Sequence, residues 1–294
     1  MYKEPLISII TVSRNSEKTI EKTINSVLSQ TYKNIEYIVI DGQSNDGTNG
    51  IVRKYINHLS VYISEPDNGI FSAMNKGIKN ASGDFLYFLN SDDFLVDEKV
   101  IEDIVTFIEK TPNCEIVYGD IEARVDDMNH WQLNSPPPEE ILRTLIDGAM
   151  HHQATFACST VFQKVGLFQE TFKSVGDYEW WLRVASDDTI QKFYVKRTVA
   201  SYFIGGKSSN IDVALREMFD VQNNAQIYQS EYWTNERIRV YQEIIRNPKG
   251  RWGLFRLEKL ESKSYFFEFR NRLSHLSLPL KRSLKYMLKR IAKR

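Results

Sequence analysis

The sequence of 294 residues contains little cysteine and no long hydrophobic run. Its two cysteines, Cys114 and Cys158, lack metal-ligand spacing, and two isolated thiols are typical of a protein kept in a reducing compartment. No apolar run approaches the roughly 18 residues that a membrane-spanning helix needs. The apolar run near the N-terminus leads into Arg14 without a small-residue cleavage site, which is unlike a signal peptide. We therefore predict a cytoplasmic protein.

Overall net charge is also absent, but the charges are unevenly distributed. The formal net charge is 0, yet the stretch from Lys249 to Arg294 holds 14 Lys or Arg against 3 Glu. That stretch carries +11, which the first 248 residues offset. We expect an α/β domain over residues 1–225 and a helical, basic region over residues 226–294.

The last segment, residues 280–294, has the pattern of a basic amphipathic helix. One face would carry Leu280, Leu284, Met287, Leu288 and Ile291, while seven Lys or Arg occupy the rest. Such helices commonly lie on anionic membrane surfaces, and a packing helix or a homo-oligomer contact is the alternative. No recognised nucleic-acid-binding motif accompanies the charge, so we expect no nucleic-acid partner.

The most informative feature present is an apolar run, Phe85–Leu89, that leads directly into Asn90, Ser91, Asp92 and Asp93. Five apolar residues without alternation indicate a strand covered on both faces. In open α/β sheets, ligands bind beyond the carboxyl ends of such strands. Carboxylate and amide oxygens suit Mg²⁺ or Mn²⁺ shared with phosphates, although a solvated acidic turn is the alternative.

Other predicted strands of the first half also end in polar clusters. They cover residues 6–12, 35–40 and 61–64, and amphipathic helices lie between them. This alternation predicts an α/β fold with a mainly parallel sheet flanked by helices, whose polar clusters meet at one edge.

The loop after the first predicted strand, Thr11 to Asn15, contains no glycine. This absence excludes the Gly-rich phosphate turn of dinucleotide-binding folds. The loop is better suited to holding a base by side chain and backbone, with Arg14 over the ring or on a phosphate.

Four segments carry a family resemblance: residues 9–15, 40–48, 65–77 and 89–93. Their residues and order resemble glycosyltransferase family 2. The resemblance extends more loosely to about residue 210 and so covers roughly two thirds of the chain. It implies the GT-A fold, with a Rossmann-like nucleotide-binding half, and inversion at the anomeric centre of a nucleotide sugar.

The resemblance also implies an activity. We expect a hexosyltransferase that uses Mn²⁺ or Mg²⁺ and a nucleotide-diphosphate donor, with a UDP-sugar favoured. A glycan or polyprenyl-linked acceptor would place the enzyme in surface polysaccharide synthesis, of capsule, O-antigen or exopolysaccharide. The basic tail would then hold it peripherally at the inner face of the cell membrane.

Site residues follow from the same resemblance. Asp92 matches the main metal ligand, with Asp93 beside it, although Asn90 stands where the family has its first acid. The predicted nucleotide-sugar contacts are Thr11, Arg14, Asn15, Asp41, Asp67, Asn68, Gly69, Asn75, Lys76, Asn90, Ser91 and Lys207. For Lys76 a solvated helix face, and for Lys207 a surface turn, is the alternative.

The catalytic base is predicted at Asp177, at the start of a helix, because inverting transfer needs a carboxylate to accept the acceptor's proton. Gly176 replaces the Glu that usually precedes it, and a simple helix N-cap is the alternative role for Asp177. His152 is assigned to the acceptor side. Of Trp180 and Trp181, one is expected in the core and the other could form a sugar-stacking wall.

Two other functions remain open. A sugar nucleotidylyltransferase could share the α/β core, but it should carry a Gly-rich loop after the first strand. A catalytically idle nucleotide-sugar-binding scaffold would explain why Asn90, Ser72 and Gly176 depart from the family's usual acids.

Overall fold

The computed structural model describes residues 4–204 and 211–246. The chain divides into two compact units, Met1–Tyr228 and Gln229–Arg294. In the second unit the structure describes one long helix, α9 (Glu231–Arg246). The predicted donor contact Lys207 and the predicted membrane segment 280–294 lie outside the described residues.

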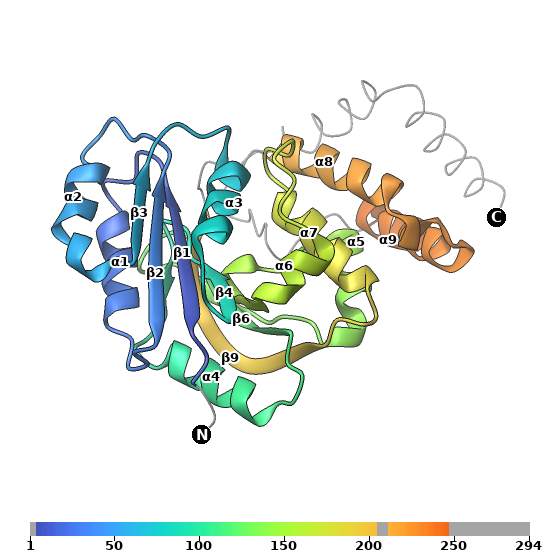
Figure 1. Cartoon of the computed structure of the whole chain (residues 1–294). Helices are drawn as coiled ribbons and strands as arrows, with labels where there is room; N and C mark the ends of the chain where they lie inside the picture. Colours follow the sequence, from blue (N-terminus) through green and yellow to red (C-terminus); the bar gives the residue numbers. More distant parts are fainter. Residues whose placement is uncertain (1–3, 205–210, 247–294) are drawn as a thin grey trace. The chain divides into compact units, whose positions relative to one another are not determined.

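A nine-stranded sheet forms the centre of the first unit (Figure 1). Its order is β3-β2-β1-β4-β8-β6-β9-β5, and β7 pairs with β6. The strands are β1 (Ile7–Ser13), β2 (Ile35–Asp41), β3 (Val61–Ser64), β4 (Phe85–Phe88), β5 (Phe94–Leu95), β6 (Ile116–Arg124), β7 (His130–Leu133), β8 (Thr155–Cys158) and β9 (Lys192–Phe203).

The four N-terminal strands are parallel, as the sequence predicts. β1 lies between β2 and β4 and is buried along its whole length, which explains its nearly continuous apolar run. The other half of the sheet is mixed: β8 is antiparallel to both β4 and β6, whereas β6 and β9 are parallel. Parallel pairing is therefore continuous from β3 to β4, where the sequence predicts alternating strands and helices, whereas the rest of the sheet combines parallel and antiparallel pairs.

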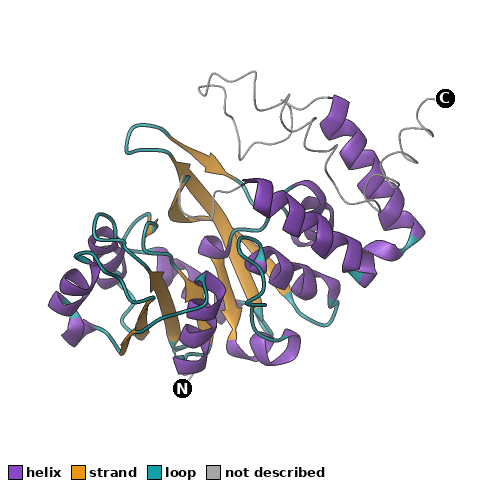
Figure 2. Cartoon of the chain, turned by 90° about the horizontal axis from the view of Figure 1, so that it is seen from above, coloured by secondary structure: helices purple, strands orange, loops and turns teal. Residues whose placement is uncertain are grey.

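Helices cover both faces of this sheet (Figure 2), which confirms the predicted α/β class. The helices of the first unit are α1 (Ile20–Leu28), α2 (Thr48–Lys54), α3 (Ile70–Asn80), α4 (Val100–Lys110), α5 (Ile141–Asp147), α6 (Ser159–Val165), α7 (Gly176–Ser186) and α8 (Ile211–Asn224). Short 3-10 helices are η1 (Ile56–His58), η2 (Pro138–Glu140), η3 (His152–Ala154) and η4 (Gln226–Gln229). Among the described residues, no helix has both the length and the apolarity to cross a bilayer.

Two packing layers hold the parallel strands. Apolar residues of α1, α2 and α4 join Ile7 and Ile9 of β1 in one buried cluster. α3 packs on β1 and β2 from the opposite face (Figure 1). Gly77 allows this close approach, because a Cβ there would lie 2.4 Å from Cγ2 of Ile10. The apolar faces that the sequence predicts for α1 and α3 are those that pack.

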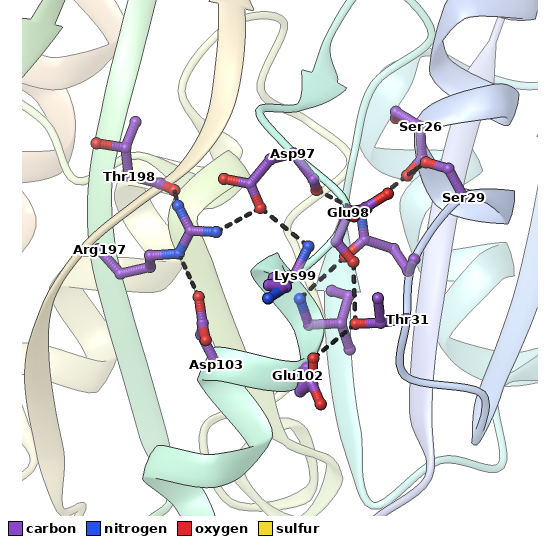
Figure 3. Close-up of polar contacts among 12 residues, drawn as sticks. Ser26, Ser29, Thr31, Asp97, Glu98, Lys99, Glu102, Asp103, Arg197 and Thr198 are labelled. Atoms are coloured by element: carbon purple, nitrogen blue, oxygen red, sulfur yellow. Dashed lines mark hydrogen bonds and ion pairs between the residues drawn. The ribbon is translucent and has the colours of Figure 1, made fainter.

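Ion pairs fix the edge of the mixed half (Figure 3). Arg197 of β9 bonds Asp97 at 2.6 Å and Asp103 at 2.9 Å, and these residues line a surface hollow of about 470 Å³. Because the guanidinium already pairs with both carboxylates, we assign this cluster to the attachment of β9 to α4.

Candidate active site

The loops that follow β1, β2 and β3 are tied together by Asp41. Its buried carboxylate accepts hydrogen bonds from Ser13 Oγ at 3.2 Å, Ser64 Oγ at 2.8 Å and the Ser44 amide at 2.9 Å. The Ser44 hydroxyl supplies a further hydrogen bond. With both oxygens engaged and 0 % of the residue exposed, this geometry does not support the predicted direct contact with a nucleoside. Asp41 instead positions the loops that could make one.

Exposed Arg14 and Asn15 and half-buried Asp67 form the accessible part of this edge. A Cβ on Gly42 would lie 2.1 Å from Oδ2 of Asp67 and 3.5 Å from Cδ of Arg14, so both side chains lie against that glycine. Asn15 has a φ of 53° and its Oδ1 accepts the Asn45 amide at 2.9 Å. The structure therefore brings together three of the predicted donor contacts.

The start of α3 adds the remaining exposed contacts. The Gly69 amide donates to Oδ1 of Asp67 at 2.9 Å, and its φ of 122° is a conformation that favours glycine. Asn68 and Gly69 are exposed next to the free amides of the helix start, where an anion is favoured. Lys76 pairs with Glu65 at 2.6 Å, so its ammonium is held on the helix surface.

Two predicted donor contacts lie in the interior instead. Thr11 is completely buried, and its hydroxyl bonds that of Tyr37 at 3.2 Å. The amide of Asn75 donates to Phe168 O at 2.8 Å and accepts from Phe168 N at 3.0 Å, which holds the loop before α7. The hydrogen bond of Thr11 joins β1 to β2, and those of Asn75 join α3 to the loop before α7. This geometry supports structural roles for both residues.

The two adjacent carboxylates after β4 have different environments. Asp93 is 1 % exposed and accepts from the Phe203 amide at 2.9 Å and from Gln153 Nε2 at 3.1 Å. Burial, and then the charge of Asp92, raises the pKa of Asp93 to about 7. This geometry does not support the predicted role of Asp93 as a metal ligand, since both oxygens tie the loop to β9 and η3. Asp92 is half-buried, and Arg124 donates to its backbone carbonyl.

Asp93 should therefore matter for stability. Replacing Asp93 by Ala leaves the Phe203 amide and the Gln153 side chain without their acceptor, which should lower the free energy of unfolding by about 2–4 kcal/mol. Asp93→Asn retains one acceptor and should cost less. Urea denaturation checks both variants. A stable Asp93→Ala protein that has lost metal-dependent nucleotide binding would instead identify Asp93 as a ligand.

The residues present fit a hard divalent cation that shares its coordination with phosphates. The described residues contain no cluster of three His, Cys, Asp or Glu side chains that could hold an ion alone. They do place Asp92 beside Asn90, whose Oδ1 is buried with no partner among them. One carboxylate and one amide oxygen, completed by a diphosphate, are typical of Mg²⁺ or Mn²⁺ sites rather than of Zn²⁺ sites.

A hydrogen-bonded chain connects this loop to the predicted base. Asn90 Nδ2 lies 3.1 Å from Nε2 of His152, and His152 Nδ1 lies 2.7 Å from Oδ2 of Asp177. Asp177 is in the first turn of α7, where the helix dipole favours a carboxylate, and its Oδ1 accepts the Tyr178 amide at 2.9 Å. The side chains of Asp177 and His152 remain 22 % and 14 % exposed.

The other acid of this helix is committed elsewhere. Glu179 receives Arg183 Nε and Nη2 at 2.9 Å each, and the guanidinium also donates to Leu167 O at 2.8 Å. Position 176 favours glycine, because a Cβ there would lie 2.8 Å from the ring of Phe71 and would force that ring to shift. Phe71 belongs to the first turn of α3, so the starts of α3 and α7 meet at this glycine.

Neither tryptophan presents a ring to an acceptor sugar. Trp180 is 3 % exposed and stacks on Phe162 with centroids 4.7 Å apart, while Trp181 is fully buried and meets Tyr118 edge-on. The enclosed space beneath His152 and Asp177 holds only about 10 Å³, which cannot admit a sugar. The geometry supports core packing for both rings and not the sugar-stacking wall.

Sequence reasoning missed three residues of this site. Gln153 donates to the Asp93 carboxylate and Arg124 to the Asp92 carbonyl, and Tyr202 interacts electrostatically with the carboxylates of the site. Burial, followed by the charges of Asp93, Asp177 and Asp92, raises the pKa of Tyr202 to about 12. Only Gln153 carried a signal, as a polar residue after two histidines; Arg124 and Tyr202 belong to strands whose pairing depends on distant parts of the chain.

Comparison with known proteins points to one family. The sequence profile of the family described as Glycosyl transferase family 2 matches residues 8–169. An uncharacterized glycosyltransferase of Rickettsia typhi is 34 % identical over 194 residues, covering 62 % of this chain and 60 % of the relative. One of Mycobacterium tuberculosis is 33 % identical over 188 residues, covering 63 % and 71 %. The chain thus spans about 60 % of the length of the first of these relatives.

Solved structures show the same fold. S. aureus TarS 1-349 has a TM-score of 0.62 at 20 % identity, with 91 % of this chain and 78 % of that chain covered. The mannosyltransferase PcManGT from Pyrobaculum calidifontis, solved in complex with GDP-Man and Mn²⁺, has a TM-score of 0.55 at 13 % identity, covering 99 % and 86 %. At these identities the likeness concerns the fold alone, and it confirms the predicted GT-A type.

Proposed function

Because the chain belongs to glycosyl transferase family 2, we propose that it transfers a hexosyl group from a nucleotide-diphosphate sugar to an acceptor hydroxyl, with inversion. The observation that carries the proposal is a hydrogen-bonded chain that joins the loop of Asp92, after β4, to Asp177, at the start of α7. The chain runs from Asn90 through His152 to Asp177, and these residues come from distant parts of the sequence.

The two carboxylates would have different tasks. Asp177 would accept the proton of the acceptor hydroxyl as its oxygen attacks the anomeric carbon, and the diphosphate leaves with the bonding electron pair. Asp92, together with Asn90, would hold Mn²⁺ or Mg²⁺, which when bound supplies positive charge to the departing diphosphate. Arg14 and the exposed loop at Asn68 and Gly69 would bind the nucleotide, and Asp67 would accept a hydrogen bond from a hydroxyl of the ribose or sugar.

A UDP-sugar is the proposed donor. TarS 1-349 is known in complex with UDP-GlcNAc and with UDP, and it shares the fold of this chain. The proposed acceptor is a glycan or polyprenyl-linked glycan of a surface polysaccharide such as capsule, O-antigen or exopolysaccharide. A relative 28 % identical over 211 residues is a PGL/p-HBAD biosynthesis glycosyltransferase of Mycobacterium bovis, which supports a biosynthetic role.

The decisive experiment is a donor panel. UDP-glucose, UDP-galactose, UDP-GlcNAc and GDP-mannose are each incubated with the enzyme and Mn²⁺, and release of the nucleoside diphosphate is measured with and without chelator. We expect metal-dependent release of UDP from one donor. Release of pyrophosphate from a sugar phosphate and UTP would indicate a nucleotidylyltransferase, and nucleotide-sugar binding without turnover would indicate an idle scaffold.

We also propose that residues 280–294 hold the enzyme on anionic lipid at the inner face of the cell membrane. Seven Lys or Arg occur in the last fourteen residues. Each contributes about 1 kcal/mol near an anionic surface, so replacing all seven by Gln should abolish sedimentation with phosphatidylserine vesicles. Donor hydrolysis in solution should be unchanged. Equal sedimentation of the full-length protein and the Gln variant would refute the membrane role.

A further inference from the structure

His152 occupies a central position that the proposed reaction leaves unexplained. Its ring lies between Asn90, which follows β4, and Asp177 in α7, and each ring nitrogen has one of these residues as its partner. The ring itself comes from η3, a third element of the fold. A side chain that touches both the loop of Asp92 and the proposed base can set their relative orientation.

The contacts determine which ring nitrogen carries the proton. The ionised carboxylate of Asp177 can only accept a hydrogen bond, so Nδ1 of His152 carries a proton and donates to Oδ2 at 2.7 Å. In the neutral imidazole Nε2 is then the acceptor, and the Nδ2 atom of Asn90, a donor, lies 3.1 Å from it. Asn90 thus fixes the tautomer that orients the carboxylate. An ionised Asp or Glu at position 90 could only accept a hydrogen bond, so it could not donate to Nε2 of His152.

The same contacts show which of the two residues can serve as the base. In a Ser-His-Asp triad the carboxylate holds Nδ1 and the imidazole takes the proton at an open Nε2. Here Nε2 already accepts from Asn90. The carboxylate of Asp177 accepts one bond on each oxygen, from His152 and from the Tyr178 amide, and it has capacity for more. Compared with that triad, the imidazole and the carboxylate therefore exchange roles: the carboxylate is open to accept the proton, and the imidazole orients it.

We infer that His152 is a positioning residue that holds the carboxylate of Asp177 for proton abstraction, and that Asn90 sets its tautomer. This inference rests on the proposed function. Without His152, the amide of Tyr178 would be the one remaining hydrogen-bond donor, among the described residues, to a half-buried side chain that can rotate about two bonds. Catalysis is sensitive to such a loss because small displacements of a reacting group lower the rate steeply.

Two amide substitutions separate the contacts of His152. His152→Asn places its amide near the position of Nδ1 and can still donate to Asp177. His152→Gln places its amide near Nε2 and can keep only the contact with Asn90. We expect His152→Asn to retain kcat within roughly tenfold, and His152→Gln and His152→Ala to lose roughly 10–100-fold, the loss typical of removing an orienting partner.

The kinetic pattern excludes a role in packing alone. If His152 only fills space, the larger Gln should preserve kcat better than Asn. The KM for the donor should stay within about twofold in all three variants, because His152 acts on the base and not on donor binding. His130→Asn and His130→Gln are the matched controls, since His130 is half-exposed and pairs with Glu122 at 2.9 Å. Both controls should keep the wild-type kcat.

The measurements use the full chain and the panel donor with the highest turnover, and thermal melting establishes that each variant folds. Nitrogen-15 NMR of the wild-type imidazole should show the Nδ1–H tautomer, and an Nε2–H tautomer would overturn the inference. A kcat for His152→Gln equal to or above that of His152→Asn would also overturn it. If the wild-type protein turns over none of the four donors, the proposed function itself fails and the positioning role fails with it.

Discussion

Asp177→Asn should reduce transfer by roughly 10²–10⁴-fold, the loss typical of removing a general base, and should leave donor affinity unchanged. The amide has no charge to accept the proton, whereas its shape still fits the first turn of α7. The proposed donor contacts Arg14 and Asp67 belong to other loops, so nucleotide binding should not depend on this carboxylate. Single-turnover transfer and UDP titration calorimetry check the two halves of the prediction.

A matched control lies just past the other end of the same helix. Asp188 is an exposed carboxylate beyond the C-terminus of α7, and Asp188→Asn makes the same chemical change away from the proposed site. It should transfer sugar at the wild-type rate. If Asp177→Asn is as active as this control, the base lies elsewhere. Glu179 would be a poor substitute, because Arg183 binds both of its oxygens at 2.9 Å.

The part of this site that the sequence predicts is the part built from consecutive strand ends. Parallel strands deliver the residues that follow them to one edge of the sheet, so the positions of Arg14, Asp67 and Asp92 follow from local patterns. The same reasoning overestimates how many polar residues there face a ligand. Asp41 and Asn75 have the right types at the right places, but their hydrogen bonds are directed at neighbouring loops.

The rest of the candidate site depends on contacts between segments that are distant in the sequence. His152 meets Asn90 and Asp177 only because β8 inserts antiparallel to β4 and brings η3 beside the loop of Asp92. No local sequence pattern predicts that pairing. The departure of Gly176 from the family's acid has a similar origin, since the ring of Phe71 in α3 fills the space beside it. Residues that depart from a motif are understood only when their neighbours in space are known.

Asp92→Asn should abolish the Mn²⁺-dependent part of UDP binding, lowering affinity by at least roughly 100-fold, beyond the 10–100-fold typical of losing an outer partner. The fold should be unaffected, because backbone groups hold this loop: the Asp93 amide donates to Asn90 O at 3.0 Å, and Arg124 donates to the carbonyl of Asp92. The Asp92 side chain can thus be changed without loss of the backbone contacts that hold its loop.

Calorimetric titration of UDP with and without Mn²⁺ measures this effect directly. Asp127→Asn is the matched control, since that side chain is 85 % exposed and pairs with Lys22 at 3.3 Å. In the wild-type protein and the control, removing Mn²⁺ should weaken UDP binding, whereas in Asp92→Asn the ion should make no difference. Unchanged affinity of Asp92→Asn for UDP in the presence of Mn²⁺ would refute the assignment. Because Asp93 is enclosed by Gln153 and the Phe203 amide, it could not take over the ion without opening the contact between β9 and η3.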